Sequence, residues 1–426
     1  MKNVLVETSH ALPLVGMTAA ALPGSLTDPP GKEGLTRLVA RLMRRTAAGL
    51  APRELDERID ALGGSLGIDA APSSVAFSGA VIARSLEPFV ELFADVLNRP
   101  GFSEEELGRL KRETQSDIVE SRDNDRALAR RWFNRAVFAG HPYGRSVSGT
   151  IPSIESIEPA DIRAHFERTL RGRALLFALA GDVDREAAER LAERLAGATA
   201  RVDAPSLATP APVGPRGRRL VFVDKPERTQ TQILIGGLGS HPHDSDHIAL
   251  HVANTVFGGT FTARLTEEVR SKRGWSYGAY SSLPYDRARQ AFSMWTFPKA
   301  EDAAPCIALE LDLLHAWRER GITKRELAWA KRYLVRSHAF AIDTASKRVS
   351  LALDERLHEL PAGYHADYTK HVQAVTLEEA NAAVRARISE DDLVVTVVGT
   401  EARIGGAVRD AIAGLSHAET VAFDAD

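Results

Sequence analysis

Two arginines stand where a metal-binding helix would carry two histidines. In the stretch Gly34-Leu-Thr-Arg-Leu-Val-Ala-Arg-Leu-Met43, Arg37 and Arg41 are four residues apart and project from the same side of a helix. Histidines at this spacing can share a zinc ion, but a guanidinium stays protonated and has no lone pair for a metal. Two such cations about 4 Å apart repel each other by roughly 4 kcal/mol at an effective dielectric constant near 20. These residue types therefore exclude zinc at this position.

The same stretch also fits an ordinary surface helix. The i, i+3, i+4, i+7 spacing of a buried stripe is formed by Leu35, Leu38, Val39 and Leu42. Arg37, Arg41 and Arg44 fall on the opposite side, so the pattern predicts a solvated face. A second hypothesis stays open, in which these arginines line a cleft and attract acidic peptide segments.

A second group of possible metal ligands follows a glycine-rich strand end. Its members are His241, His243, Asp244, Asp246, His247 and His251. His247 and His251 have a zinc-compatible i, i+4 spacing, but Ile-Ala-Leu lies between them, so no glutamate is placed to act as a general base. The pattern favours structural or solvent-facing histidines, with adventitious metal binding as the alternative.

The composition narrows the possible classes of protein. The chain has 426 residues, 44% of them hydrophobic, which is enough for two domains with sizeable cores. A net charge of −3 gives no global attraction to nucleic acid or anionic membranes. The single cysteine, Cys306, excludes an internal disulfide framework. Glu7 and His10 interrupt any signal-peptide core, and no apolar run approaches the roughly 20 residues of a membrane helix, so we expect a soluble, cytoplasmic protein.

The chain has the pattern of a duplicated domain. Residues 101–107 correspond to 321–327 at an offset of 220 residues, and 174–181 correspond to 392–399 at an offset of 218. The second pair are apolar runs that end in glycine, which predicts buried strands, and a polar helical segment precedes each. A period this long indicates a duplicated domain and not a solenoid.

Within each half, strand-like runs alternate with longer helical patterns. Strands are predicted over 75–82 and 289–296, and helices over 85–97, 158–168, 262–272, 324–338 and 377–387. The proline-rich segment 201–217 cannot hold a regular helix or a central strand and is predicted to be a linker. We therefore expect an α+β protein with two homologous, sandwich-like domains, 1–200 and 218–426. Each would be a sheet with packed helices, and together they would form half of a clamshell.

Short signatures run in a fixed order along nearly the whole chain. In the first half they are Gly34-Leu35, Leu62-Gly-Gly-Ser65, Leu97-Asn-Arg-Pro100, Gly140-His-Pro-Tyr-Gly144, Gly149 and Ala180-Gly-Asp-Val183. In the second half they are Val256-Phe-Gly-Gly259, Ala263-Arg-Leu265 and Glu268-Val-Arg-Ser-Lys-Arg-Gly-Trp-Ser-Tyr277. No single signature is specific. Their order and spacing resemble the pitrilysin-type zinc metallopeptidases, in the branch of mitochondrial processing peptidase and its bacterial relatives.

Active members of that family carry His-x-x-Glu-His on the first helix and a further glutamate ligand about eighty residues on. The resemblance places Arg37, Ala40 and Arg41 at the motif positions, and Ile118, beside Asp117, at the distal one. Both histidines and the general base are therefore absent, and we expect no metal in this chain.

The family's C-terminal domain contributes an arginine and a tyrosine, seven residues apart, to the catalytic chamber. Here they are Arg270 and Tyr277, and we expect helix 262–272 to end near Gly274 and Tyr277 to open the next strand. A phenol can donate to the carbonyl oxygen as it gains negative charge, and arginine can hold a neighbouring carbonyl or carboxylate. The family's non-catalytic subunit also has a long glycine-rich substrate loop. Only Gly258 and Gly259 stand there in this chain, as candidate substrate-binding residues that also fit a tight turn.

Together these features predict the non-metal subunit of a heterodimeric zinc endopeptidase. A homologous partner with His-x-x-Glu-His would hold the zinc, and Arg270 and Tyr277 would complete its site for unfolded or short peptides. The alternative is an inactive scaffold of the same fold, in which both residues can be changed without loss. A third hypothesis, a self-sufficient hydrolase using the His247 region, requires bound zinc and chelator-sensitive activity in the single chain.

Overall fold

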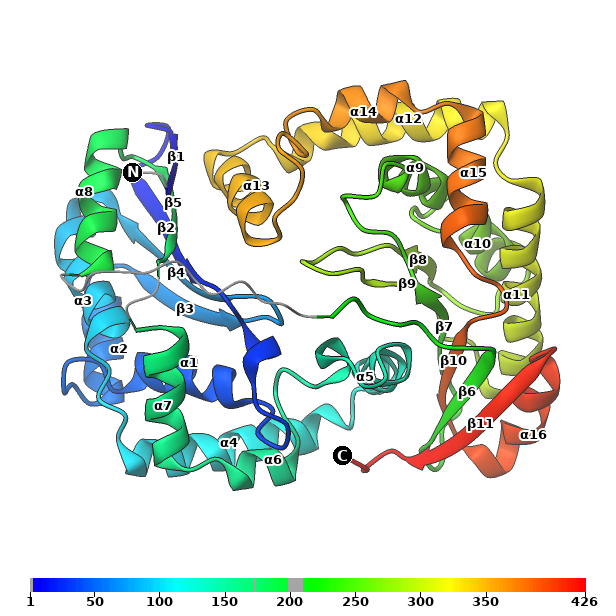
Figure 1. Cartoon of the computed structure of the whole chain (residues 1–426), viewed down its shortest axis with the longest axis horizontal. Coiled ribbons are helices and arrows are strands. Elements are labelled where there is room, and N and C mark those ends of the chain that lie inside the picture. The colour runs from blue at the N-terminus through cyan, green and yellow to red at the C-terminus, as the bar shows by residue number, and fades with distance from the viewer. Residues whose placement is uncertain (1–2, 172–173, 198–209) are drawn as a thin grey trace. The chain divides into compact units, whose positions relative to one another are not determined.

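The chain folds into two compact units that each combine segments from both halves of the sequence. The computed structural model describes residues 3–171, 174–197 and 210–426. The first unit contains residues 3–118, 146–171, 174–197 and 339–360, and the second contains 119–145, 210–338 and 361–426 (Figure 1). Of the predicted linker, residues 201–209 lie outside the described residues, and 210–217 form neither helix nor strand.

The first unit is built on a five-stranded sheet with the order β1-β5-β2-β4-β3. Its strands are β1 Val4–Thr8, β2 Leu14–Ala21, β3 Ser65–Ala70, β4 Val75–Ile82 and β5 Leu176–Gly181. β1 and β5 are parallel, and the other neighbours are antiparallel. β3 therefore forms one edge of the sheet.

The second unit repeats this topology and adds a strand. Its strands are β6 Arg218–Asp224, β7 Gln232–Leu238, β8 Ala279–Ser282, β9 Ala291–Thr296, β10 Val394–Gly399 and β11 Leu415–Ala422. The strand order is β11-β6-β10-β7-β9-β8. The last five of these strands correspond in turn to β1, β5, β2, β4 and β3 of the first sheet, and each pair of neighbours has the same parallel or antiparallel direction. The predicted duplication of a mixed α/β domain is thus confirmed.

Helices pack on both sheets. The first unit has α1 Leu35–Arg45, α2 Pro52–Ala61, α3 Leu86–Asn98, most of α4 Glu104–Ser121, α6 Ile151–Ser156, α7 Pro159–Thr169, α8 Arg185–Ala196 and α13 Ala345–Leu357. The second has α5 Asp125–Val137, α9 His247–Phe257, α10 Arg264–Thr266, α11 Ala303–Arg320, α12 Lys324–His338, α14 Tyr368–Ala374, α15 Leu377–Arg387 and α16 Glu401–Ala411. Across the described part of the chain, none of the helices combines the length and apolarity that crossing a membrane requires.

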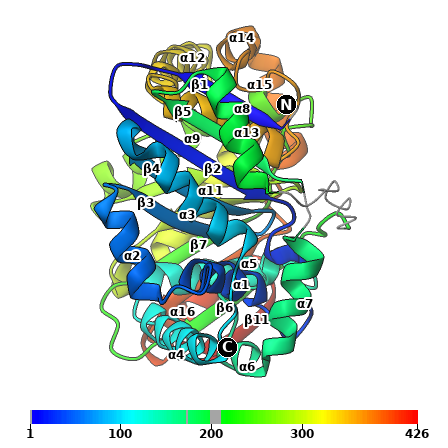
Figure 2. The ribbon, with the colours of Figure 1, turned by 90° about the vertical axis from the view of Figure 1, so that its left-hand side faces the viewer.

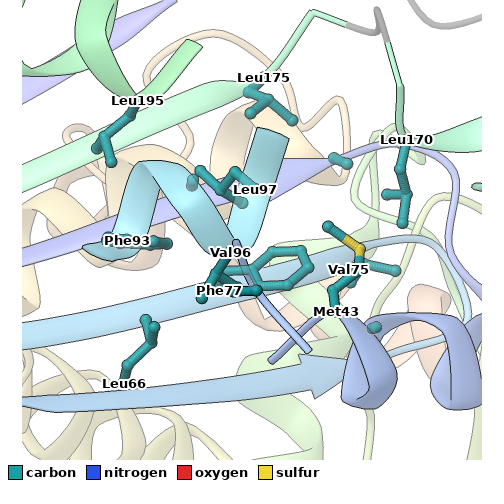
Figure 3. Packing of buried hydrophobic residues seen from close by; sticks show 14 of the residues in the cluster. Met43, Leu66, Val75, Phe77, Phe93, Val96, Leu97, Leu170, Leu175 and Leu195 are labelled. Atoms are coloured by element: carbon teal, nitrogen blue, oxygen red, sulfur yellow. The ribbon is translucent and has the colours of Figure 1, made fainter. Parts of the chain in front are cut away.

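The main core of the first unit lies between one face of its sheet and helices from the first half of the chain. Alternate strand residues point to this face, and α3 and α8 cover it (Figure 2). Phe93, Val96 and Leu97 of α3 lie over the strands that carry Leu66 and Phe77 (Figure 3). This layer also includes α1, so the core fixes the helix that carries Arg37 and Arg41.

The opposite face of each sheet is covered by a helix from the other half of the sequence. In the first unit, Val349 and Leu353 of α13 pack on Ala20, Ala178 and Ala180, whose small side chains admit a close approach. In the second unit, α5 packs against β6, β7 and β10. The two helices begin at residues 125 and 345, at the offset of 220 found in the repeat. The expected division into 1–200 and 218–426 did not anticipate this exchange.

This exchange predicts which sheet each helix stabilises. Phe93 on α3 and Phe133 on α5 are both fully buried and both belong to the first half of the chain. Changing either to alanine should cost about 3–5 kcal/mol of unfolding free energy. Amide hydrogen exchange should show Phe93→Ala loosening β1 to β5, and Phe133→Ala loosening β6, β7 and β10. Loosening of the same sheet by both substitutions would contradict the exchange.

Candidate functional site

Arg270 and Tyr277 are positioned by a turn that leads from a helix into an edge strand. α10 is short and continues into a π-helical turn, Glu267–Lys272, which carries Arg270. Gly274 then adopts φ +67°, and its amide donates to the Arg270 carbonyl oxygen at 2.9 Å. β8 begins only at Ala279, so the prediction that Tyr277 opens the strand is wrong by two residues.

The turn brings the two predicted side chains together on the surface. The guanidinium carbon of Arg270 lies 4.4 Å from the ring centroid of Tyr277 and 4.0 Å from that of Phe261. Tyr277 is 71% exposed and Phe261 54%. Within the described ranges, no carboxylate pairs with Arg270. Two cation–π contacts therefore orient the cation without neutralising it.

This arrangement leaves two donor groups available to a ligand. The Arg270 guanidinium lies over both rings, and its N–H groups have no carboxylate partner among the described residues. The Tyr277 side chain is held by its ring, and a phenol can donate one hydrogen bond. A guanidinium beside a phenol can bind a carbonyl or carboxylate oxygen. The catalytic role of this pair stays a prediction.

Gly258 and Gly259 have structural places in the same region. Gly258 is buried at the end of α9, and its carbonyl oxygen accepts from the Ser281 amide of β8 at 2.9 Å. A Cβ at Gly258 would lie 2.4 Å from Ser281 Oγ, so only glycine lets the helix end approach the strand this closely. Gly258 is thus largely covered by the contact between helix and strand, Gly259 is exposed, and a substrate contact by either glycine stays a prediction.

The positions that match the zinc motif are filled by packing and by ion pairs. Ala40 is completely buried in the core. Arg41 lies 3.5 Å from Asp117 and 3.7 Å from Glu113, both on α4. Its side chain is 26% exposed, and Arg37 is also half-buried, so the prediction of a plain solvated face is wrong. Arg37 and Arg41 therefore lie at the rim of the core layer around α1, and carboxylates of α4 pair with Arg41.

A buried carboxylate fixes the start of α1. Asp28 accepts from the amides of Gly34 and Thr36, each at 2.9 Å, and from the Thr36 hydroxyl at 2.6 Å. Burial raises the pKa of Asp28 to about 6, against the lowering effect of these hydrogen bonds. Gly34 has φ +94°, and a Cβ there would lie 2.9 Å from the Ser148 carbonyl oxygen. Sequence reasoning found Gly34 but missed Asp28 as its partner.

The residues of this chain do not fit a zinc ion at the motif positions. Arg37 and Arg41 add two positive charges, and the nearest distal carboxylate, Asp117, is engaged by Arg41. In the part of the chain that the structure describes, histidine, cysteine and acidic side chains nowhere gather in a group of three that could hold a metal.

The second histidine group has structural contacts. The His247 ring nitrogens lie 2.7 Å from Ser240 Oγ and 3.0 Å from Tyr364 Oη, so both are occupied. His251 Nε2 lies 3.0 Å from Tyr368 Oη. Burial lowers the pKa of both histidines to about 4. These contacts favour the structural interpretation of the group over metal binding.

Zinc content provides a direct test of the motif positions. We predict that the purified chain, equilibrated with zinc and passed through a desalting column, retains much less than one zinc ion per molecule by elemental analysis. His247→Gln should leave that low value unchanged, because the ring nitrogens already have partners. Stoichiometric zinc that is lost in His247→Gln would instead revive the self-sufficient hydrolase.

Burial of neutral His247 also predicts acid sensitivity. Its pKa is about 4 when folded and about 6.5 when unfolded, so the unfolded chain binds the additional proton. This contribution to stability is complete above pH 6.5 and is lost as the pH falls towards 4. Urea denaturation should show that the unfolding free energy falls between pH 7 and pH 5. This fall should be about 2 kcal/mol smaller in His247→Gln than in the unmodified chain. The exposed control His243→Gln should retain the full dependence.

Comparison with known proteins identifies the family. Residues 15–151 match Insulinase (Peptidase family M16), and residues 156–334 match the Peptidase M16 inactive domain. An uncharacterized zinc protease of Mycobacterium bovis is 27% identical over 381 residues, covering 86% of this chain and 84% of that protein. The non-peptidase homolog YmxG of Helicobacter pylori is 21% identical, covering 93% and 92%.

Solved structures agree with this assignment. The crystal structure of the peptidase M16 inactive domain from Pseudomonas fluorescens has a TM-score of 0.85 and 26% sequence identity, and the match covers 93% of this chain and 95% of that chain. The pitrilysin-type resemblance inferred from the short signatures is therefore confirmed. The chain belongs to peptidase family M16.

Proposed function

We propose that this chain is the non-metal subunit of a heterodimeric zinc endopeptidase of family M16. The observation that carries the proposal is the exposed Arg270–Tyr277 pair, held together by ring stacking while the zinc-motif positions carry Arg37, Ala40 and Arg41. The chain thus lacks the metal-binding part of such a site and has the residues suited to binding and polarising a peptide. Its partner would be a homologous chain with His-x-x-Glu-His.

The chemistry of this chain's residues suits peptide hydrolysis. The partner's zinc would activate the attacking water. In this chain, the Tyr277 hydroxyl would donate to the carbonyl oxygen as it gains negative charge, and the Arg270 fork would hold a neighbouring carbonyl or carboxylate. Stacking against Phe261 and Tyr277 fixes the guanidinium beforehand, which reduces the entropy lost on binding.

The strand beside the pair supports a peptide as the ligand. β8 begins two residues after Tyr277 and is an edge strand, paired within the described residues only with β9. An extended peptide can add to such an edge through main-chain hydrogen bonds. Unfolded or short peptides are therefore the proposed substrates, and the cytoplasm is the proposed compartment.

The alternative is an inactive scaffold of the same fold, and the two proposals differ in what Tyr277 does. The Helicobacter pylori relative YmxG is described as a non-peptidase homolog, which fits a chain that has no activity by itself under either proposal. Only a shared active site requires the hydroxyl group of Tyr277.

Cleavage of a quenched, unstructured peptide tests the proposal. The chain alone should be inactive, and mixing it with a His-x-x-Glu-His relative from the same cell should give activity. Tyr277→Phe should then lower kcat by about 10²–10³, because one oxyanion donor is lost. The control Tyr333→Phe changes another exposed tyrosine, on α12, and should retain full activity. Activity that does not rise with a partner shown to bind, or that is unaffected by Tyr277→Phe, would favour the scaffold.

A further inference from the structure

The arginines of α1 differ in how fully their charges are neutralised. Arg41 pairs with Glu113 and Asp117, Arg44 with Asp56 at 2.6 Å, and Arg45 with Glu113 at 2.5 Å. Arg37 is half-buried on the same helix, yet among the described residues no carboxylate oxygen lies within ion-pair distance of its guanidinium. Arg37 is therefore the one of these four cations that lacks a partner in the described structure.

The surroundings of Arg37 favour an added negative charge. Burial lowers the pKa of Arg37, and the positive charge of Arg41 lowers it further, while Asp117 and Asp69 act in the opposite direction without pairing with it. Asp117 is already engaged by Arg41. A half-buried cation without a partner is unfavourable, and a carboxylate that formed a bidentate pair with it would remove that cost.

The position of Arg37 lies along the open edge of the first sheet. β3 is an edge strand that pairs only with β4 in the described structure. Arg44 Nε donates to the Leu66 carbonyl oxygen of β3 at 3.2 Å, so α1 runs beside this strand. Arg37 lies on the same face of α1, two turns before Arg44, and the charge of Asp69 on β3 acts on it.

We propose that Arg37 is a carboxylate-binding site for an acidic peptide lying along the edge of β3. The position that carries a metal ligand in active relatives would then select for a negative charge on the substrate. The carboxylate can belong to an aspartate or glutamate side chain or to a peptide C-terminus. This inference names the substrate class within the proposed function, and it rests on that function only in taking a peptide as the ligand.

Binding of matched peptides to the full-length chain tests this proposal by fluorescence anisotropy. Three labelled peptides share one unstructured sequence: one has a central glutamate and an amidated C-terminus, one has glutamine and an amidated C-terminus, and one has glutamine and a free C-terminus. The chain should bind at least one carboxylate peptide about tenfold or more tightly than the amidated glutamine peptide, and added salt should reduce that difference. The carboxylate peptide that shows the preference identifies the source of the charge.

Two matched variants show whether Arg37 is the cause. Arg37→Gln should abolish the preference for a carboxylate and leave binding of the amidated glutamine peptide unchanged. Arg44→Gln removes the same charge from the same helix at a position already paired with Asp56, so it should retain the preference. The thermal midpoint of Arg37→Gln should be no lower than that of the unmodified chain, because no ion pair is lost.

The outcomes separate this inference from the proposed function. Equal affinity for all three peptides, or equal losses in Arg37→Gln and Arg44→Gln, would overturn the role of Arg37 while leaving peptide binding intact. A chain that binds none of the peptides would overturn both.

Discussion

A strand that is buried on both faces needs apolar cover on both faces, and this constraint organises the whole chain. Every residue of β10 is buried, and β6 and β7 are buried over most of their lengths. One layer of that cover comes from α9 and α11, which follow β7 and β9 along the chain, and the other from α5, which precedes the second sheet by about eighty residues. The first sheet receives α13 in return. The turn that carries Arg270 and Tyr277 depends on a sheet that neither half of the sequence completes.

Ion pairs made by its arginines hold α1 against α4, in addition to its packing in the core. Zinc would join the first helix to a distal carboxylate in the active relatives that the sequence resembles. Here the guanidinium groups of Arg41 and Arg45 meet Glu113 and Asp117 on α4. Exposed pairs of this kind contribute little one at a time, but here several share a partner at the rim of a packed core. These ion pairs connect α1 to α4, and Arg37 is the cation of this helix that has no ion-pair partner among the described residues.

Much of the fold could be predicted because local patterns repeat along the chain. The strand 75–82 and the helices 324–338 and 377–387 have the predicted bounds, since apolar periodicity and capping residues are local signals. The helix exchange could not be read in this way, because periodicity shows that α5 and α13 have a buried face but not which sheet covers it.

Within the candidate site, the spacing of Arg270 and Tyr277 was predicted, whereas the π-helical turn and the stacking on Phe261 were not. These features depend on contacts between residues that no local pattern links. The half-burial of Arg37 and Arg41 was missed for the same reason.

The order of synthesis delays the completion of the first unit. All strands of its sheet have been made once residue 181 is added, but α13 follows only about 160 residues later. At a translation rate of 5–20 residues per second, one apolar face of that sheet stays uncovered for roughly ten to thirty seconds until α13 has been synthesised. Binding by a chaperone during that interval would protect the nascent chain from aggregation.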